Sequence, residues 1–515
     1  MSTPSAGLPI IYVRGYAGGT PGIEKAVTDP FYGFNQGSTH IRVGRQDNPV
    51  LYQFESPLLR LHLDEGYHIV VEGPRPEKTE APPPESIWIH RFYDVCSGTW
   101  GGQAQAFDLE SAARDLLELI DHVRERTGAR RVNLVAHSMG GLICRCLLQK
   151  IIPVERGERA TEYVSKLFTY GTPHGGITFA VGFGVPEALR DLFNINGSDI
   201  FGPERMYQYL TPHPDPDGPP DGWRAVDITD DDGSGEPADA AGRFPLDRVF
   251  CMVGTNSRDY DVGRGISAEA VGPRSDGLVQ IENAQVTGAN RAFAYRSHSG
   301  CYGLVNSEEG YQNLRRFLFG DLKAATDLVG VRLPAEEEVT WQAEVRLTVR
   351  GLPVLMHERV APHWCPIQLS DPTEASRRAR AATAGDGAVP LATTFLSSRL
   401  RQGNAGPLRF VLDLNLLSLR QTRGLFGFGD HLEQTADFAD TLIVDVDAGG
   451  PRPAAWANWN SEVPGAIRDL HPTGDPLPDE DPQAASWLAH VPLPATTRPI
   501  LGPDARIRLS VGPWN

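Results

Sequence analysis

A serine flanked by small residues stands at position 138, within the stretch RVNLVAHSMGGLICRCLL of residues 131–148. The apolar run Val132–Ala136 predicts a buried strand, and the apolar residues after the serine recur with helical spacing. A tight strand-to-helix turn needs small residues two positions before and after its tip, and Ala136 and Gly140 meet this need. Such a turn projects the Ser138 hydroxyl from the edge of a sheet, where it can act as a nucleophile.

A serine nucleophile needs a neighbouring base, and the base needs an acid that orients it. For this kind of turn the chain order is serine, acid, histidine, each in a loop that follows a strand. His298 follows the last strand of its region, and Asp276 lies in a Gly-containing turn before it. We therefore predict Ser138, Asp276 and His298 as the catalytic residues. The alternative candidates are His174 for the base, and Asp259 and Asp261 for the acid.

Backbone amides near the serine are the expected donors to an oxyanion. We predict the amide of Met139, the residue after the serine, and the amide of Tyr16 in the Gly-rich loop after the first strand. Ala17 is the alternative to Tyr16. A Gly-rich loop in this place also suggests a dinucleotide site, but glycines 15, 18 and 19 do not have the GxGxxG spacing.

The elements that would position these residues alternate between short apolar runs and helical patterns up to about residue 320. This alternation predicts a mostly parallel sheet covered by helices. The clearest helical pattern follows Asp108, a suitable N-cap, and ends before Gly128, a suitable left-handed C-terminal cap. A second helix is expected at Tyr311–Phe319. The predicted strands are Ile10–Val13, His68–Val71, Ile87–Phe92, Val132–Ala136, Leu167–Tyr170, Val249–Val253 and Ala292–Tyr295.

Residues 176–245 interrupt the alternation, first with an apolar segment and then with a Pro/Asp/Gly-rich loop. This insertion is expected to be a cap or lid. Phe179, Phe183 and Leu189 are candidates for the lining of an apolar substrate cleft. The alternative is that they pack cap helices onto the domain.

The hydrophobic period changes to two after about residue 335, as VTWQAEVRLTVR illustrates. We predict an α/β domain over residues 1–325 and a separate antiparallel β-domain, a sandwich in form, over residues 335–515. Further strands are expected around Leu408–Leu417, Leu442 and Arg506–Val511, with loops at 371–391 and 448–484. The β-domain is a candidate for contact with a glycan, a lipid or a protein: Trp456 and Trp459 could stack on sugars, although buried tryptophans are more common in sandwiches.

Composition excludes several classes of protein. The chain has 48 Lys and Arg against 65 Asp and Glu, a formal charge of −17, so nucleic acid is not an expected partner. Six cysteines in 515 residues are too few for a disulfide scaffold, and no CxxC metal spacing occurs. No apolar run reaches the length of a membrane span. We expect a cytoplasmic protein, or a secreted one if a signal peptide has been removed, without metal or organic cofactor.

Five motifs, in order along roughly residues 8–320, resemble the α/β-hydrolase superfamily, and within it lipase-like serine hydrolases such as triacylglycerol lipases and the GPI inositol-deacylase-like group. They read VRGYAGG, VNLVAHSMGGLICR, LFTYGTPHGG, SDGLV and SHSG. The resemblance implies Ser138 as nucleophile, Asp276 and His298 as its partners, and the amides of Tyr16 and Met139 as the oxyanion hole. The family usually has His-Gly in the oxyanion loop, where this chain has Arg14 and Gly15.

Residues and resemblance together predict a serine carboxylic-ester hydrolase that acts through an acyl-enzyme. The expected substrate is a small-molecule or lipid ester with a hydrophobic part. The alternatives are an acyltransferase, thioesterase or amidase that uses the same three residues, and a binding protein with a hydrolase fold and no activity.

Overall fold

The chain divides into two compact units, of which the first comprises Met1–Asn290 and Arg296–Tyr311, and the second Arg291–Tyr295 and Gln312–Asn515. The structure is a computed structural model. It describes residues 7–15, 24, 27–28, 38–43, 49–54, 57–70, 81–97, 106–178, 200–228, 244–260, 268, 271–300, 303–334, 339–369, 387–401, 406–422, 431–450, 452–467 and 470–514.

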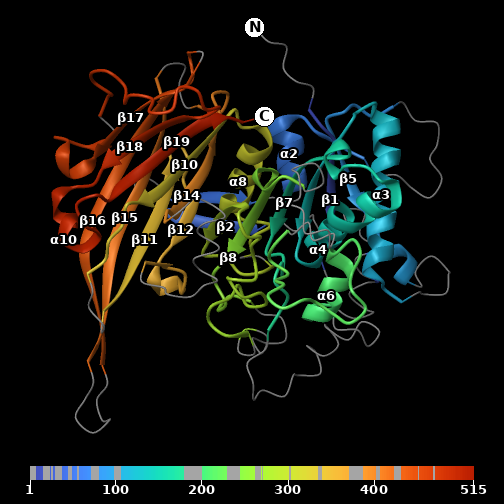
Figure 1. Cartoon of the computed structure of the whole chain (residues 1–515). Coiled ribbons are helices and arrows are strands. Elements are labelled where there is room, and N and C mark those ends of the chain that lie inside the picture. The colour runs from blue at the N-terminus through green and yellow to red at the C-terminus, as the bar shows by residue number, and fades with distance from the viewer. Residues whose placement is uncertain are drawn as a thin grey trace. The chain divides into compact units, whose positions relative to one another are not determined.

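A seven-stranded sheet has the strand order β4-β5-β1-β6-β7-β8-β9 (Figure 1). Every neighbouring pair from β4 to β8 is parallel. All seven predicted strands occur in this sheet, so the prediction of a mostly parallel sheet is confirmed. The bounds are β1 Ile10–Val13, β4 His68–Ile69, β5 Ser86–His90, β6 Val132–His137, β7 Val164–Tyr170, β8 Val249–Gly254 and β9 Asn290–Ala294.

Helix α3, Leu109–Thr127, has the predicted caps. The Asp108 side chain accepts a hydrogen bond from the Ser111 amide at 2.9 Å, and Gly128 closes the helix with a φ of 71°. The apolar face of α3 packs in one core with α4, Met139–Cys146, and with alternate residues of the strands, such as Ile11 and Val13 of β1. Ile10 and Tyr12 are buried as well, because parallel strands are covered on both faces.

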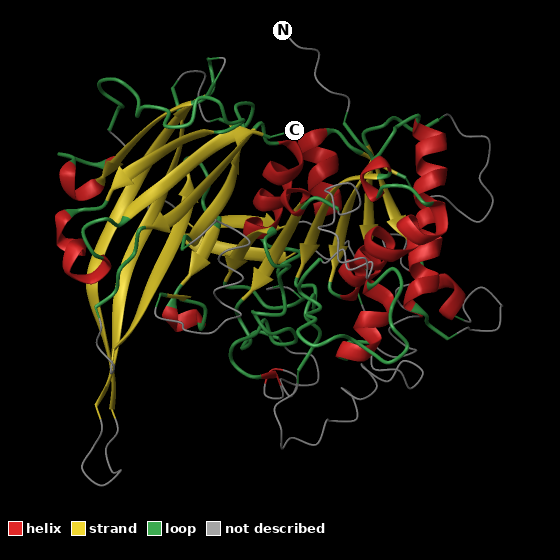
Figure 2. Ribbon diagram, viewed as in Figure 1, coloured by secondary structure: helices red, strands yellow, loops and turns green. Residues whose placement is uncertain are grey.

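The first unit contains further elements around this core. The predicted helix at Tyr311–Phe319 is confirmed as part of α8, which crosses from the first unit into the second. Figure 2 shows helices beside the strands of the first unit. The remaining bounds are β2 Ser38–Val43, β3 Pro49–Phe54, α2 Pro57–Glu65, a π-helical segment Leu147–Arg156, α6 Pro203–Leu210 and α8 Glu308–Phe319.

Arg145 binds α4 to the described part of the insertion. Its side chain is 1% exposed, and its guanidinium donates to the carbonyl oxygens of His174, Ala225 and Asp227 at 3.1, 2.7 and 3.3 Å. Within the insertion, α6 contributes Met206 to the same core as α3 and α4. The insertion after β7 is therefore anchored on the helix that follows Ser138.

The second unit is an antiparallel β-domain, as predicted, and consists of two sheets. Their orders are β14-β10-β19-β18 and β12-β11-β15-β16-β17, with β13 beside β11. Apolar side chains of both sheets share one core, the arrangement of a sandwich. The bounds are β10 Leu322–Val329, β11 Val339–Val349, β12 His357–Arg359, β13 Ile367–Gln368, β14 Val389–Leu396, β15 Leu408–Thr422, β16 His431–Asp447, β17 Ala454–Trp459, β18 Trp487–Pro492, α10 Arg498–Leu501 and β19 Arg506–Pro513.

Two predicted loops of the β-domain are wrong in part. Strand β14 begins at Val389, and β17 lies inside the predicted loop 448–484. The sequence of β17, AAWANW, has no regular alternation of large apolar and polar residues, so its hydrophobic period is weak. Trp459 is buried in the sandwich core and donates its Nε1 proton to the Pro492 carbonyl at 2.8 Å. Its ring is therefore not a platform for sugars.

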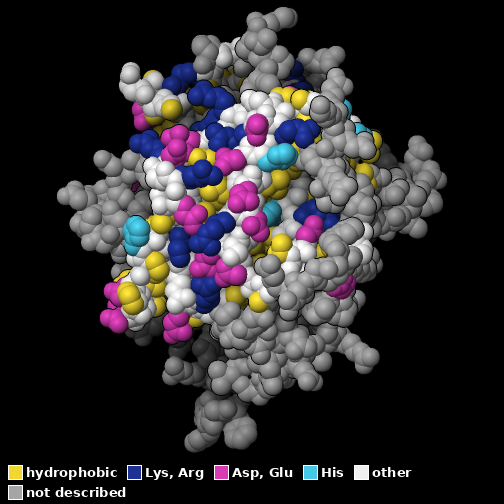
Figure 3. All heavy atoms as spheres, turned by 90° about the vertical axis from the view of Figure 1, so that its right-hand side faces the viewer, with side chains coloured by type: hydrophobic (Ala, Val, Ile, Leu, Met, Phe, Trp, Pro, Cys, Tyr) yellow, Lys and Arg dark blue, Asp and Glu magenta, His cyan; other side chains and the backbone are white. Residues whose placement is uncertain are grey.

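The face of the first unit shown in Figure 3 carries basic and acidic side chains mixed with one another. Ion pairs connect α3 with the segment that follows α4: Arg114 with Glu155, and Asp121 with Arg156, each at 2.7 Å. Exposed pairs of this kind contribute little to stability, about 0–1 kcal/mol each. In the described part of the chain, no helix combines the length and apolarity that a membrane span requires.

Candidate active site

The turn after β6 holds Ser138 in a strained backbone conformation, with φ 54° and ψ −129°. Two glycines make the turn possible. A Cβ atom on Gly140 would lie 2.3 Å from the Val13 carbonyl oxygen, and one on Gly141 would lie 2.2 Å from Thr172 Oγ1. The small residues that the sequence indicated are thus required by the close approach of β1 and of the loop after β7. Positive φ at a serine costs of order 1–3 kcal/mol, so the conformation persists only because the surrounding packing stabilises it.

The three predicted catalytic residues meet at the C-terminal edge of the sheet. His298 Nε2 lies 2.9 Å from Ser138 Oγ, and His298 Nδ1 lies 2.8 Å from Asp276 Oδ2. An ionised carboxylate only accepts, so the proton of the neutral imidazole resides on Nδ1 and Nε2 accepts from the serine hydroxyl. The side chains are buried, with residue exposures of 5%, 2% and 0% for Ser138, His298 and Asp276.

Asp276 is fixed by hydrogen bonds at both carboxylate oxygens. Its Oδ1 accepts from the amides of Leu278 and Val279 at 3.0 and 2.8 Å, while Oδ2 faces His298. The His298 amide also donates to the Asp276 carbonyl at 2.8 Å, so the two loops are joined by main chain as well. The carboxylate can therefore orient the imidazole without moving.

Sequence reasoning missed His137, the neighbour of the serine. Its Nε2 donates to the His298 carbonyl at 3.0 Å, and the two rings lie 4.9 Å apart. Burial, with the nearby His298 as a further cause, lowers the pKa of His137 to about 3, so the ring is neutral at physiological pH. No sequence signal identified this contact, because the partner is a main-chain atom 161 positions away.

Two other residues close the space around the imidazole. The ring of Tyr260 meets the His298 ring edge to face at 5.7 Å, and burial, with the Asp276 charge adding to it, raises the pKa of Tyr260. On another side, a Cβ atom on Gly171 would lie 2.9 Å from Asp276 Oδ2 and 3.1 Å from His298 Nδ1. Gly171 was not among the predicted site residues, although it directly follows a predicted strand.

The alternative base and acids have other surroundings. His174 is fully buried, with its Nε2 3.1 Å from Thr169 Oγ1 and 3.6 Å from Cys251 Sγ, and burial lowers its pKa well below the ordinary value. Asp259 accepts from the Asn256 side chain at 2.6 Å. Asp261 lies outside the described residues.

The predicted oxyanion donors are only partly described. Met139 is buried and is the first residue of α4, directly after Ser138. The loop after β1 passes against the serine, since a Cβ atom on Gly15 would lie 2.5 Å from Ser138 Cβ. The residues that lie outside the described part of the chain are Tyr16, Ala17, Phe179, Phe183 and Leu189. Among the described residues, no group of three or more His, Cys, Asp or Glu side chains could hold a metal ion.

Comparison with known proteins agrees with this architecture. Residues 76–187 match a family model described as alpha/beta hydrolase fold. No curated protein matches the chain. The first unit, with its parallel sheet and flanking helices, has the α/β-hydrolase fold, followed by the antiparallel β-domain.

Solved structures give weaker similarities. A mature lipase from Bacillus licheniformis is 14% identical, with a TM-score of 0.31, over 62% of this chain and 94% of that one. A gene product of Listeria innocua is 12% identical, with a TM-score of 0.25, over 61% and 94% of the two chains. Lipase B of Aspergillus fumigatus is 9% identical, with a TM-score of 0.29, over 61% and 52%.

Proposed function

We propose that this chain is a serine carboxylic-ester hydrolase of the lipase or esterase type, with Ser138 as nucleophile, His298 as general base and Asp276 as the acid that orients it. One observation carries the proposal: a continuous hydrogen-bonded path runs from Ser138 Oγ through both nitrogens of His298 to Asp276, at 2.9 and 2.8 Å. The strained turn that presents the serine adds support.

The proposed reaction has two acyl-transfer steps. His298 Nε2 takes the hydroxyl proton as Ser138 Oγ attacks the ester carbonyl, and the imidazolium then gives this proton to the departing alcohol. Asp276 stabilises the transient positive charge without accepting the proton. In the second step water attacks the acyl-enzyme, His298 takes its proton, and the acid leaves as Ser138 regains its hydroxyl proton.

Two backbone amides are proposed to stabilise the tetrahedral oxyanion, those of Met139 and Tyr16. The position of Met139 at the start of α4 favours negative charge nearby, because free amides and the positive end of the helix dipole meet there. The contact of Gly15 with Ser138 supports a donor from the loop after β1. Removal of one such donor typically reduces kcat about 10²–10³-fold.

The proposed substrate is a small-molecule or lipid ester with a hydrophobic part. The insertion after β7 contributes this specificity in the proposal, with Phe179, Phe183 and Leu189 as the residues that would contact the acyl or alcohol group. A panel of p-nitrophenyl esters of increasing chain length, run beside a thioester and an amide of matched length, tests the bond and the chain preference together. Turnover of the thioester or amide in preference to every ester would contradict the proposal.

A fluorophosphonate probe tests the nucleophile directly, because it bonds covalently only to an activated serine. We expect labelling of the wild-type chain and none of Ser138→Ala. Ser111→Ala is the matched control, since Ser111 lies in the first turn of α3, bonded to the cap residue Asp108. Equal labelling of both variants, or no labelling of the wild type, would contradict the proposal.

A further inference from the structure

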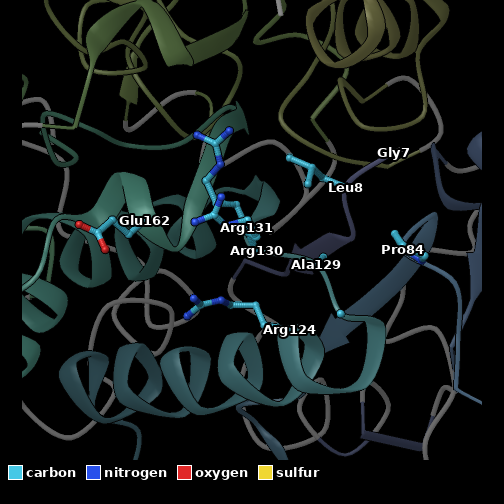
Figure 4. A pocket seen from close by; sticks show the side chains of 9 residues that line it. Gly7, Leu8, Pro84, Arg124, Ala129, Arg130, Arg131 and Glu162 are labelled. Atoms are coloured by element: carbon cyan, nitrogen blue, oxygen red, sulfur yellow. The ribbon is translucent and has the colours of Figure 1, made fainter. Parts of the chain in front are cut away.

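A pocket lies at the N-terminal edge of the parallel sheet, opposite the edge that holds Ser138. It has a volume of about 610 Å³ and is lined by residues that precede the strands: Leu8 before β1, Pro84 before β5, and Arg130 and Arg131 before β6 (Figure 4). Strand β6, which ends at His137 next to Ser138, separates the two places by roughly 20 Å. The pocket is therefore distinct from the proposed active site.

Three guanidinium groups line this pocket, from the last turn of α3 and from the loop after it. Figure 4 shows Arg124, Arg130 and Arg131, with Glu162 to one side and Leu8 and Pro84 to the other. Arg124 has partners, Asp121 at 3.3 Å and the ring of Tyr163 at 4.5 Å. Neither Arg130 nor Arg131 forms an ion pair with a carboxylate of the described residues.

Positive charge continues along this edge into the next strands. Lys166 is buried in β7, and Arg248 directly precedes β8, so the neighbouring strands β6, β7 and β8 each have a basic residue near their first residues. Burial, together with Arg248 and Arg130, lowers the pKa of Arg131. Burial and Arg248 likewise lower the pKa of Lys166 to about 7. The smaller, coulombic part of both shifts comes from these neighbouring arginines, so basic groups lie close together here in a chain whose formal charge is −17.

We propose that this pocket binds a small organic phosphate monoester, with its phosphate on the guanidinium groups of Arg130 and Arg131. Guanidinium forks match the oxygens of a phosphate, and a dianion relieves the repulsion between these two neighbouring guanidinium groups. The volume exceeds what inorganic phosphate fills and falls in the range of small-molecule sites. Glu162 disfavours a second anionic group and can accept from hydroxyls, so the rest of the ligand is neutral and hydroxylated.

Isothermal titration calorimetry on the full chain tests the proposal with three probes: glycerol 3-phosphate, inorganic phosphate and glycerol. We expect saturable binding of glycerol 3-phosphate, weaker binding of inorganic phosphate and none of glycerol. In the double variant Arg130→Gln/Arg131→Gln, the affinity for glycerol 3-phosphate should fall at least about 10-fold, since both phosphate contacts are removed. Added salt should weaken the wild-type interaction.

Arg114→Gln is the matched control, because Arg114 is an exposed arginine of α3 that pairs with Glu155, and it should change the affinity less than about 2-fold. The single reversal Arg130→Glu, at an exposed position, is a second variant that does not depend on the folding of the double variant. It should likewise lower the affinity for glycerol 3-phosphate at least about 10-fold.

Several outcomes would overturn the proposal. They are no saturation of the wild type up to about 10 mM glycerol 3-phosphate, equal affinity of wild type and Arg130→Glu, or equal affinity for inorganic phosphate and the monoester. Sedimentation with phosphatidic acid vesicles separates a lipid headgroup from a soluble ligand. Association with these vesicles in the absence of any soluble binding would overturn the assignment of a small ligand.

Discussion

The two edges of the parallel sheet use opposite kinds of residue. At the C-terminal edge, glycines and short side chains bring Ser138, Asp276 and His298 into hydrogen-bond contact away from water. At the N-terminal edge, long arginine side chains surround an open pocket. Proton transfer requires positions fixed within a fraction of an ångström, whereas attraction of an anion requires mainly charge. We therefore expect activity at the C-terminal edge to be lost when atoms are displaced, and anion binding at the N-terminal edge to be lost when charge is removed.

The largest expected effect is that of Ser138→Ala on ester hydrolysis. Without the nucleophile, kcat should fall about 10⁶-fold, because His298 and Asp276 contribute little to catalysis when the serine that they activate is absent. The substitution removes one oxygen and keeps Cβ, so the thermal midpoint should stay close to that of the wild type. Steady-state kinetics with a p-nitrophenyl ester measures the loss, and residual activity above about 1% would remove Ser138 from the mechanism.

Asp276→Asn should reduce kcat about 10⁴-fold, since an amide in place of the carboxylate favours the wrong imidazole tautomer. The chain offers a matched control in Asp259→Asn, because Asp259 is bonded to Asn256 and not to His298. This control should change kcat less than about 10-fold. A larger loss for Asp259→Asn than for Asp276→Asn would transfer the role of the acid to Asp259.

The substitutions Gly140→Ala and Gly128→Ala compare how an added Cβ atom changes the free energy of unfolding at the two edges. A Cβ atom at Gly140 would contact the Val13 carbonyl at 2.3 Å, whereas one at Gly128, after α3, meets nothing within 4 Å. We expect a loss of at least about 3 kcal/mol for Gly140→Ala from the backbone clash. Gly128→Ala should cost about 1 kcal/mol, from its positive φ alone. Urea unfolding measures both, and equal losses would contradict the steric explanation of the turn.

Low pH should destabilise the fold, because buried histidines lie at the C-terminal edge. Burial lowers the pKa of His90 to about 4 and contributes most of the fall at His137 to about 3, so both are neutral in the folded chain. The unfolded chain binds protons below about pH 6.5, so stability falls from there towards pH 4. Each histidine contributes up to about 3 kcal/mol of this loss.

The urea midpoint as a function of pH measures this effect. His90 donates to the Ala112 carbonyl at 2.9 Å, so His90→Gln keeps a donor while it removes the titration. We expect a flatter pH dependence below pH 6.5 in His90→Gln. An unchanged slope would show that other groups cause the acid sensitivity.

The smallest expected effect is that of Arg130→Gln/Arg131→Gln on ester hydrolysis. These arginines lie at the edge opposite Ser138, so kcat/KM for a neutral ester should change less than about 2-fold. A change of 10-fold or more in either direction would show that the two edges are coupled, which would contradict the expectation that they act independently.

The sequence predicted the parallel strands well because strands buried on both faces are short, continuous apolar runs, as in Val132–His137. Strand β10 was not predicted. Its buried positions in LKAATDLV include an alanine and a threonine, so the alternation of apolar and polar residues is weak. The β2–β3 hairpin lies in a stretch without a clear period. For the candidate site, motif order indicated Ser138, Asp276 and His298, whereas His137 and Gly171 depend on tertiary contacts that no local pattern encodes.

The guanidinium of Arg145 limits how this scaffold can be engineered. A new insertion grafted between β7 and β8 must supply carbonyl oxygens where His174, Ala225 and Asp227 now supply them. A graft without these acceptors would leave an uncompensated cation inside the domain, directly on the helix that begins after Ser138. Exchange of the insertion to alter substrate range should therefore keep residues 174 and 225–227, or replace Arg145 by an apolar residue in the same step.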